Sequence, residues 1–176
     1  MKILLTFFVL FFSSSISFNS YGDASDKTIC VETDGQDRNS IIFLPNQTEP
    51  FTGNNLCEYK NGQFKSKGEI KNGIEDGKWT WWFENGQIQY EATYKVGTLV
   101  VETKYLYYES GQIEAKEYYK DELDGKVTLW YEDGQIKAEG NYKDGKGDGK
   151  WIWWYEDGQI KSEKNYKDGV CISGDC

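Results

Sequence analysis

An internal repeat of 23 to 25 residues constrains this 176-residue chain more than any other feature. Each copy centres on a turn ending in Gly-Gln, and the anchor glycines are Gly62, Gly86, Gly111, Gly134 and Gly158. An aromatic residue stands three positions before each glycine, and Phe or Ile stands two positions after it. Ile or Tyr followed by Lys stands eight positions after it. Five copies in register indicate a repeat architecture in which neighbouring units pack on one another.

Each copy predicts a β-hairpin. The pairs Asn-Gly and Asp-Gly at the anchor are typical of a two-residue type I′ turn, because both central residues of that turn need a positive φ. This register pairs Phe83 with Ile88 and Tyr155 with Ile160 across the hairpin. Alternation along the strands adds Trp79, Trp81, Trp151 and Trp153 to the same face. We interpret that face as the core, and we expect Trp81 and Trp153 to be buried.

Four large rings fall on the opposite face, each four residues before an anchor glycine: Trp82, Tyr107, Trp130 and Trp154. One interpretation is that the rings shield their own sheet, with Lys137 over Trp130 and Lys161 over Trp154 in cation–π pairs. The other is that the rings bind a partner, since contiguous exposed apolar surface marks interaction sites. Both interpretations stay open at this point.

The fold class that follows is all-β: an extended, twisted and open antiparallel meander of five hairpins over residues 51–170. A capping segment over residues 23–50 precedes it, because terminal units of repeat arrays need a cap. Residues 171–176 form a C-terminal disulfide cap.

Residues 1–22 have the pattern of a secretory signal peptide: Lys2, an apolar run from Ile3 to Phe12, and a Ser-rich stretch. The run is shorter than the roughly 20 residues of a membrane-spanning helix. An uncleaved anchor or a buried helix is the alternative. We expect an exported protein, periplasmic or secreted, without membrane insertion after cleavage.

Export makes disulfides the expected state of the four cysteines. Ten strands at about 4.8 Å spacing separate the two ends of an open array by far more than the roughly 5.5 Å between bridged Cα atoms. The pairs expected are therefore Cys30–Cys57 and Cys171–Cys176, whereas a link between the two ends would require a closed barrel. A zinc site of four thiolates is disfavoured, because paired CxxC spacings are absent.

The composition speaks against several classes of function. A net charge of −9 disfavours nucleic acid and anionic lipid as partners. The chain has no histidine, the commonest acid/base catalyst and transition-metal ligand. The segment 144–150 fits neither a phosphate loop nor a calcium loop. Glutamates recur at one repeat position as Glu91, Glu139 and Glu163, which favours a structural column over a catalytic carboxylate pair. We predict no catalytic residues, no metal site, no cofactor and no enzymatic activity.

The recurring pattern Gly-x-Trp-x-x-Tyr/Phe-x-Asn/Asp-Gly-Gln-Ile-x-x-Glu-x-x-Tyr-Lys-Asp-Gly resembles the MORN-repeat variant family. It is most similar to the bacterial branch that is often labelled as antitoxins of toxin–antitoxin pairs. The resemblance runs from about Arg38 to Gly169. The third copy departs from it, with Glu102 and Lys104 in place of Gly and Trp and with Val96 in place of the turn Asp. We expect a local irregularity there.

The resulting hypothesis is an exported, non-catalytic protein that binds another protein through Trp82, Tyr107, Trp130 and Trp154. The resemblance implies an immunity or antitoxin role, and the acidic charge favours a basic toxin as the partner. The alternative is a cell-wall or carbohydrate-binding module that uses the aromatic ladder. Choline-binding hairpin modules are a further comparison, but their Gly-Trp pair and shorter period are missing.

Overall fold

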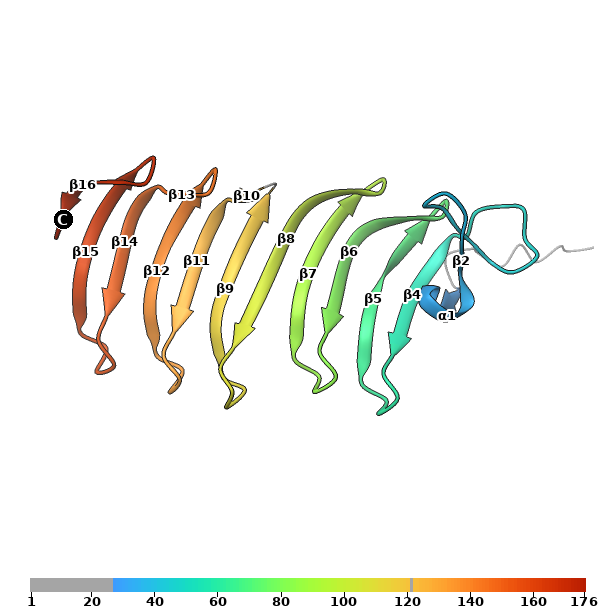
Figure 1. The fold of residues 1–176 in the computed structure, drawn as a ribbon, viewed down its shortest axis with the longest axis horizontal. Coiled ribbons are helices and arrows are strands. Elements are labelled where there is room, and N and C mark those ends of the chain that lie inside the picture. Colours follow the sequence, from blue (N-terminus) through green and yellow to red (C-terminus); the bar gives the residue numbers. More distant parts are fainter. Residues whose placement is uncertain (1–26, 121) are drawn as a thin grey trace, which may run out of the picture.

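The computed structural model describes residues 27–120 and 122–176, which form one long sheet with a small cap at its N-terminal end (Figure 1). The predicted signal peptide, residues 1–22, lies outside the described residues, as do residues 23–26 of the predicted cap. The elements of the cap are β1 (Thr28–Ile29), α1 (Val31–Asp34), β2 (Gln36–Asp37) and β3 (Ile42–Phe43).

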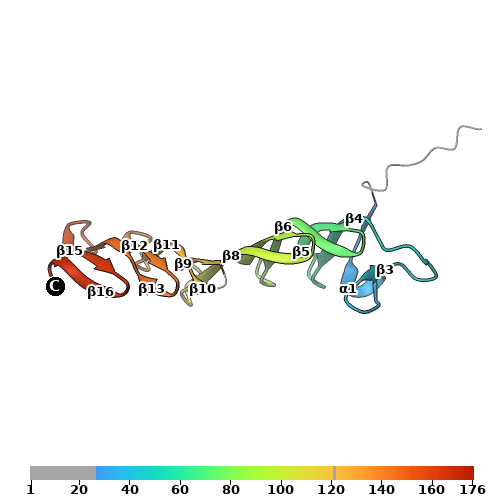
Figure 2. The same cartoon turned by 90° about the horizontal axis from the view of Figure 1, so that it is seen from above.

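Five hairpins follow, and together they confirm the predicted meander. Their strands are β4 (Gly53–Glu58) with β5 (Phe64–Lys71), β6 (Ile74–Trp82) with β7 (Ile88–Lys95), β8 (Thr98–Tyr107) with β9 (Ile113–Lys120), β11 (Gly125–Trp130) with β12 (Ile136–Lys143), and β14 (Gly149–Trp154) with β15 (Ile160–Lys167). Short strands β10 (Glu122–Leu123) and β13 (Lys146–Gly147) pair with β9 and β12, and β16 (Val170–Gly174) ends the sheet. From β4 to β16 neighbouring strands are antiparallel, while β1 pairs with β4 in parallel. The sheet does not close into a barrel, as expected, and Figure 2 shows it as one extended layer.

The turns at the anchor glycines differ from the prediction. In the second hairpin the Phe83 N–H donates to the Gln87 carbonyl (2.8 Å) and the Gly86 N–H donates to the Phe83 carbonyl (2.9 Å). Gly86 has a φ of 85°, whereas Asn85 is not among the residues with positive φ. This is the three-residue loop of a type I turn followed by a glycine bulge, not a type I′ turn. The other four anchor turns have the same pair of hydrogen bonds.

The bulge also changes the pairing next to the turn. Ile88 pairs with Trp82 and Ile160 pairs with Trp154, so the predicted pairs Phe83–Ile88 and Tyr155–Ile160 are wrong. The register shifts by one residue between Trp81 and Trp82, which restores the expected pairing further along the strands. The Phe or Ile after each turn therefore belongs to the face of Trp82 and Trp154, not to the predicted core face.

Type I′ geometry occurs instead in the turns that follow the second strand of a hairpin, which we call the linker turns. Both central residues have positive φ at Asn72-Gly73, Val96-Gly97, Asp144-Gly145 and Asp168-Gly169. Val96 has a φ of 52° and its side chain is exposed. Left-handed backbone is costly for a β-branched residue, so the irregularity expected in the third copy appears as local strain rather than as a lost turn.

Burial follows contacts within the sheet, because most of this single layer has solvent on both faces. Trp79 and Trp151 are buried, with 3% and 7% of their surface exposed. Trp81 and Trp153 are half-buried, and so are Trp82 and Trp154 on the opposite face. The expectation that Trp81 and Trp153 are buried is therefore wrong, although the two sets of rings do lie on opposite faces.

The two buried indoles lie on glycines of the preceding hairpin. A Cβ added at Gly140 would come within 2.0 Å of the Trp151 ring, and one added at Gly68 within 2.1 Å of the Trp79 ring. The indole N–H of Trp151 donates to the Asn141 carbonyl at 3.0 Å. Trp79 makes the equivalent bond to the Glu69 carbonyl at 3.1 Å. Each of these tryptophans thus fastens its hairpin to the one before it.

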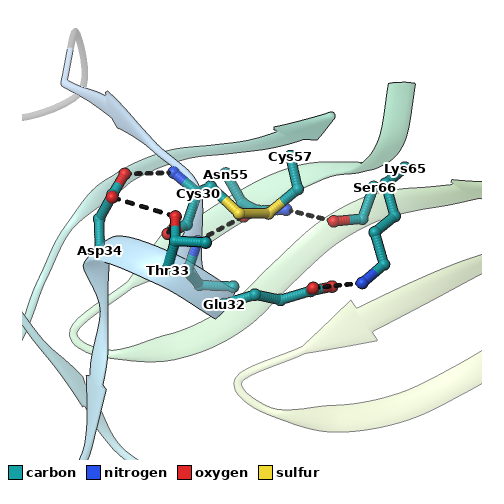
Figure 3. Close-up of a disulfide and its surroundings, with 9 residues drawn as sticks. Cys30, Glu32, Thr33, Asp34, Asn55, Cys57, Lys65 and Ser66 are labelled. Atoms are coloured by element: carbon teal, nitrogen blue, oxygen red, sulfur yellow. Dashed lines mark hydrogen bonds and ion pairs between the residues drawn. A yellow bond between two sulfur atoms is a disulfide. The ribbon is translucent and has the colours of Figure 1, made fainter. Parts of the chain in front are cut away.

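The cap packs on the first two hairpins and is fixed there by a disulfide (Figure 3). Cys30 and Cys57 are bonded, with their Cα atoms 4.6 Å apart, as predicted. The buried Asn55 accepts a hydrogen bond from the Val31 N–H through Oδ1 (3.0 Å) and donates to the Ser66 hydroxyl (3.0 Å). Cap residues thereby complete the polar contacts of β4.

Apolar side chains fill the space between the cap and the sheet. The buried residues are Ile29, Phe51, Ile70 and Trp79, and Val31, Ile42, Leu44, Trp81 and Tyr94 pack against them. We call the sheet face that carries this cluster the cap face. At the far end, the predicted Cys171–Cys176 disulfide is also present, with Cα atoms 5.9 Å apart.

Candidate binding surface

The four rings singled out from the sequence lie on one face of the sheet, one on each of four successive hairpins. Trp82, Tyr107, Trp130 and Trp154 each end the first strand of a hairpin, and each pairs with the Ile that begins the second strand. All four are half-buried. We call this surface the ladder face. Phe64 of the first hairpin packs against Trp82, with ring centroids 5.9 Å apart.

The Phe or Ile beside each ring adds to the apolar area of the ladder face. Phe64, Ile136 and Ile160 are exposed, and the equivalent Ile88 and Ile113 are half-buried. Sequence reasoning placed these side chains on the core face and so missed this contribution. A contiguous strip of aromatic and aliphatic side chains on a solvent-facing sheet is typical of an interaction surface.

The lysines expected to cover the tryptophans lie elsewhere. Lys137 Nζ is 5.6 Å from the ring centroid of Tyr131, and Lys161 Nζ is 5.6 Å from that of Tyr155. The predicted pairs with Trp130 and Trp154 are wrong, because the bulge shifts the register beside these rings by one residue. The two cation–π contacts on which the shielding interpretation depends are therefore not made with the ladder rings.

Tyrosine hydroxyls connect neighbouring hairpins beneath the ladder. Each of three tyrosines, three residues before an anchor glycine, donates to the backbone carbonyl of the next ladder residue: Tyr59 to Trp82 (2.8 Å), Tyr108 to Trp130 (2.7 Å) and Tyr131 to Trp154 (2.8 Å). Phe83 holds this position in the second copy and has no hydroxyl. Its ring instead meets Tyr107 edge-on at 6.3 Å. These bonds fix the backbone that carries the ladder rings.

Ion pairs recur on the ladder face in the second, fourth and fifth hairpins. Lys78 pairs with Glu91 (2.5 Å), Lys126 with Glu139 (2.7 Å), and Lys150 with Glu163 (2.9 Å). The glutamates are those that the sequence assigned to a structural column, and each lies beside a lysine of the neighbouring strand. Exposed pairs of this kind contribute little to stability, about 0–1 kcal/mol each. Their main effect is to place charged side chains on the same face as the ladder rings.

The third copy replaces its ion pair with a cluster of tyrosine and lysine. The Tyr105 hydroxyl donates to Glu91 Oε2 at 2.8 Å, and Lys116 Nζ lies 5.3 Å from the Tyr105 ring. Partial burial would raise the pKa of Glu91, but the hydrogen bonds from Lys78 and Tyr105 outweigh it and lower this pKa. Burial, together with the bond to Glu91, raises the pKa of Tyr105. On the cap face of the same copy, the bond to Glu117 raises the pKa of Tyr119 to about 12.

Carboxylates gather along the edge formed by the anchor turns, which is the lower edge in Figure 1. The exposed acidic residues of these turns are Glu84, Glu109, Glu132, Asp133, Glu156 and Asp157. Asp133 and Asp157 accept the backbone N–H of the following glutamine, at 2.9 Å in both turns. At the opposite edge, the linker turns mix aspartate with lysine. The acidic edge therefore borders the ladder face on one side.

Other motifs receive structural explanations. The glycine-rich segment 144–150 contains a linker turn and the short strand β13. Within the described residues, no three His, Cys, Asp or Glu side chains are arranged to hold a metal ion. No helix in the described part of the chain is long and apolar enough to cross a membrane.

The model of the MORN repeat variant family matches four segments, residues 75–95, 103–121, 123–144 and 147–168. The chain belongs to the MORN repeat variant family. The four matched MORN repeats begin at the second hairpin, and the first hairpin has the same anchor turn and the same pairing although it lies outside the matched segments.

No curated protein matches the chain. Among solved structures, the chain is similar to one chain of the "Crystal structure of GtfA/B complex bound to UDP and GlcNAc", at 10% identity and a TM-score of 0.24. That similarity covers 80% of this chain and 27% of the other, so the MORN protein spans about a quarter of its length.

Proposed function

We propose that this MORN repeat protein is an exported, non-catalytic binding protein that docks a basic protein partner on its ladder face. The observation that carries the proposal is the alignment of Trp82, Tyr107, Trp130 and Trp154 on one face of a single-layer sheet. Trp and Tyr are the side chains most enriched at interface hot spots. The two disulfides and the signal-like N-terminal sequence support export.

The acidic edge supports a partner of positive charge. Carboxylates on the anchor turns border the ladder on one side, and the whole chain carries a net charge of −9. Complementary charge steers a partner into the correct orientation, and the association is weakened by salt. The finer form of the proposal is that the partner is a basic toxin of the same compartment, which this protein neutralises.

The test is recovery of partners from the native compartment by the wild type and by a folded Trp130→Ala/Trp154→Ala variant. The variant should recover the partner at least about tenfold less well, because truncating one interface anchor costs about 2 kcal/mol or more. Equal recovery by both proteins would show that the rings only cover the sheet. Retention on purified cell wall or glycan, with no protein recovered, would favour a carbohydrate-binding module instead.

A matched pair of charge variants tests the role of the acidic edge. Asp133→Asn/Asp157→Asn removes two charges from the anchor turns, where Asn61 and Asn85 show that asparagine fits. Asp144→Asn/Asp168→Asn removes two charges from the linker turns, where Asn72 shows the same. The first variant should bind the partner more weakly and with less dependence on salt, and the second should bind as the wild type does. Equal effects at both edges would contradict docking along the anchor turns.

A further inference from the structure

A pocket of about 240 Å³ opens on the cap face near the C-terminal end of the sheet, away from the ladder. Tyr142, Trp151, Trp153 and Tyr166 line it together with two glycines. Trp151 and Trp153 stack, with ring centroids 5.6 Å apart and planes inclined by 24°. Tyr142 meets Trp151 edge-on at 5.2 Å, and Tyr166 meets Trp153 at 6.4 Å and 65°. Four rings from three adjacent strands thus form a preformed aromatic site.

The same cluster occurs three repeats earlier in the chain. Trp79 and Trp81 stack at 5.3 Å and 23°, and Tyr94 meets Trp81 at 6.4 Å and 66°. Ile70 holds the position that corresponds to Tyr142. The two clusters therefore have nearly the same geometry, and the N-terminal one shows which side chains pack on such a surface.

The cap and the segment before β4 cover the N-terminal cluster, where Ile29 and Phe51 are buried together with Ile70 and Trp79. Val31, Ile42 and Leu44 pack there, and the Ile42 N–H donates to the carbonyl of the linker-turn Gly73 at 2.8 Å. Tyr90 covers Trp81 further by stacking on it at 4.3 Å. Both covers are missing at the C-terminal cluster. Ser162 pairs with Trp153 where Tyr90 pairs with Trp81, and the cap lies at the other end of the sheet.

We propose that the pocket at Trp151 and Trp153 is a second binding site, which takes branched aliphatic side chains from a loop of a partner protein. The cap loop of this chain is the template for that occupant, since its Ile42 and Leu44 side chains pack against the buried group that contains Trp79. The cap itself cannot supply the occupant, because the Cys30–Cys57 disulfide holds it to the first hairpin. Lys164 Nζ already lies 5.8 Å from the Trp153 ring, and its charge disfavours a cationic ligand there.

The test follows the indole N–H signals of Trp79, Trp81, Trp151 and Trp153 by NMR in the whole protein. Two aliphatic probes are added separately: 3-methyl-1-butanol, which matches a leucine side chain, and a synthetic peptide with the sequence of residues 35–51. Tetramethylammonium and methyl glucoside serve as cationic and carbohydrate probes. Each aliphatic probe should shift the signals of Trp151 and Trp153, while those of the covered Trp79 and Trp81 stay in place. The covered cluster is thus an internal control.

The variant Ser162→Tyr provides the matched control, because it supplies at Trp153 the ring that Tyr90 supplies at Trp81. It should weaken the response to both aliphatic probes at least about tenfold, the factor expected for losing one buried aliphatic contact. A peptide carrying Ile42→Asp and Leu44→Asp should lose the response by the same factor. No shift with the aliphatic probes, or a shift with tetramethylammonium or methyl glucoside alone, would overturn the proposal. The ladder variants should leave the binding of these probes unchanged, so this test can fail independently of the proposed function.

Discussion

Glycine and tryptophan are matched in size across neighbouring copies of the repeat. Where one copy carries a buried indole, the preceding copy has a glycine beneath it, as in the pairs Gly68–Trp79 and Gly140–Trp151. Where that ring is absent, the glycine is absent too. Lys104 and Val127 hold the tryptophan position in the third and fourth copies, and Ala92 and Glu117 hold the glycine position in the copies before them. The pattern has a steric cause, since a ring lying flat on a strand leaves no room for a Cβ.

Gly140→Ala should destabilise the protein by about 1–3 kcal/mol, as overpacking of a well-packed site does. The Trp151 ring cannot swing aside without losing its hydrogen bond to the Asn141 carbonyl. Urea denaturation of Gly140→Ala, Trp151→Val and the double variant measures the coupling between the two sites. In the Trp151→Val background the alanine should cost little. An equal cost in both backgrounds would mean that the glycine is needed for another reason.

Val96 differs from the residues at the same position of the other linker turns. Three equivalent turn positions hold Asn72, Asp144 and Asp168, which tolerate a left-handed backbone better than a β-branched residue does. Val96→Asn should therefore stabilise the protein by about 1 kcal/mol, since the exposed valine has few packing contacts to lose. Equilibrium unfolding measures the gain, and Asn72→Val should show a loss of similar size. A neutral or destabilising Val96→Asn would indicate that the valine side chain has a packing role.

The hairpins themselves could be predicted from the sequence, but their turns could not. The repeat period, the meander and both disulfides followed from spacing and reach, because these depend on strand geometry alone. Asn-Gly suits both a type I′ turn and the glycine position of a type I turn with a bulge, so the dipeptide leaves the choice open. Choosing the wrong turn moved Ile88 and Ile160 to the wrong face and the lysines to the wrong rings.

Burial was the other feature that the sequence could not give. Alternation along a strand separates two faces but does not say which face is covered, and here one layer exposes most of both. Trp151 is buried because Gly140 lies beneath it, whereas Trp153 on the same face pairs with Ala138 and Ser162 and has no such glycine beneath it. The co-occurrence of Gly and Trp in adjacent copies was the available signal for the buried rings.

At three of the joints between hairpins, a tyrosine three residues before the anchor glycine donates its hydroxyl to the next hairpin, and the last copy offers a natural control. Tyr131 donates to the Trp154 carbonyl, whereas Tyr155 holds the same position in the hairpin of β14 and β15, which the single strand β16 follows in the described part of the chain. Tyr131→Phe should cost about 1 kcal/mol, the net value of one hydrogen bond, and Tyr155→Phe should cost almost nothing. Thermal or urea unfolding of the two variants compares them directly. Equal losses would show that the hydroxyl acts through its solvation and not through the hydrogen bond that links the two hairpins.

At the scale of the whole molecule, nearly every contact is made between strands that are adjacent in the chain. Such a protein is quasi-one-dimensional, and its stability is the sum of units and the interfaces between neighbours. Its two disulfides also link only neighbouring units: Cys30–Cys57 joins the cap to the first hairpin, and Cys171–Cys176 closes a loop at the last strand. Neither bond restrains the far end of the array, so a change at one end should stay local.

Hydrogen exchange on Cys30→Ala/Cys57→Ala tests this locality. The bond spans 27 residues and the C-terminal bond spans 5, so loop-closure entropy predicts losses of about 3.5 and about 2 kcal/mol on removing each. In the first variant exchange should quicken in β1, β4 and β5, while β14 and β15 keep wild-type rates, because they share no contact with the cap. In Cys171→Ala/Cys176→Ala the pattern should reverse, with faster exchange in β15 and β16. Faster exchange along the entire sheet in either variant would show that the array unfolds as one cooperative unit, and a change at the cap would then also reach the ladder face and the C-terminal pocket.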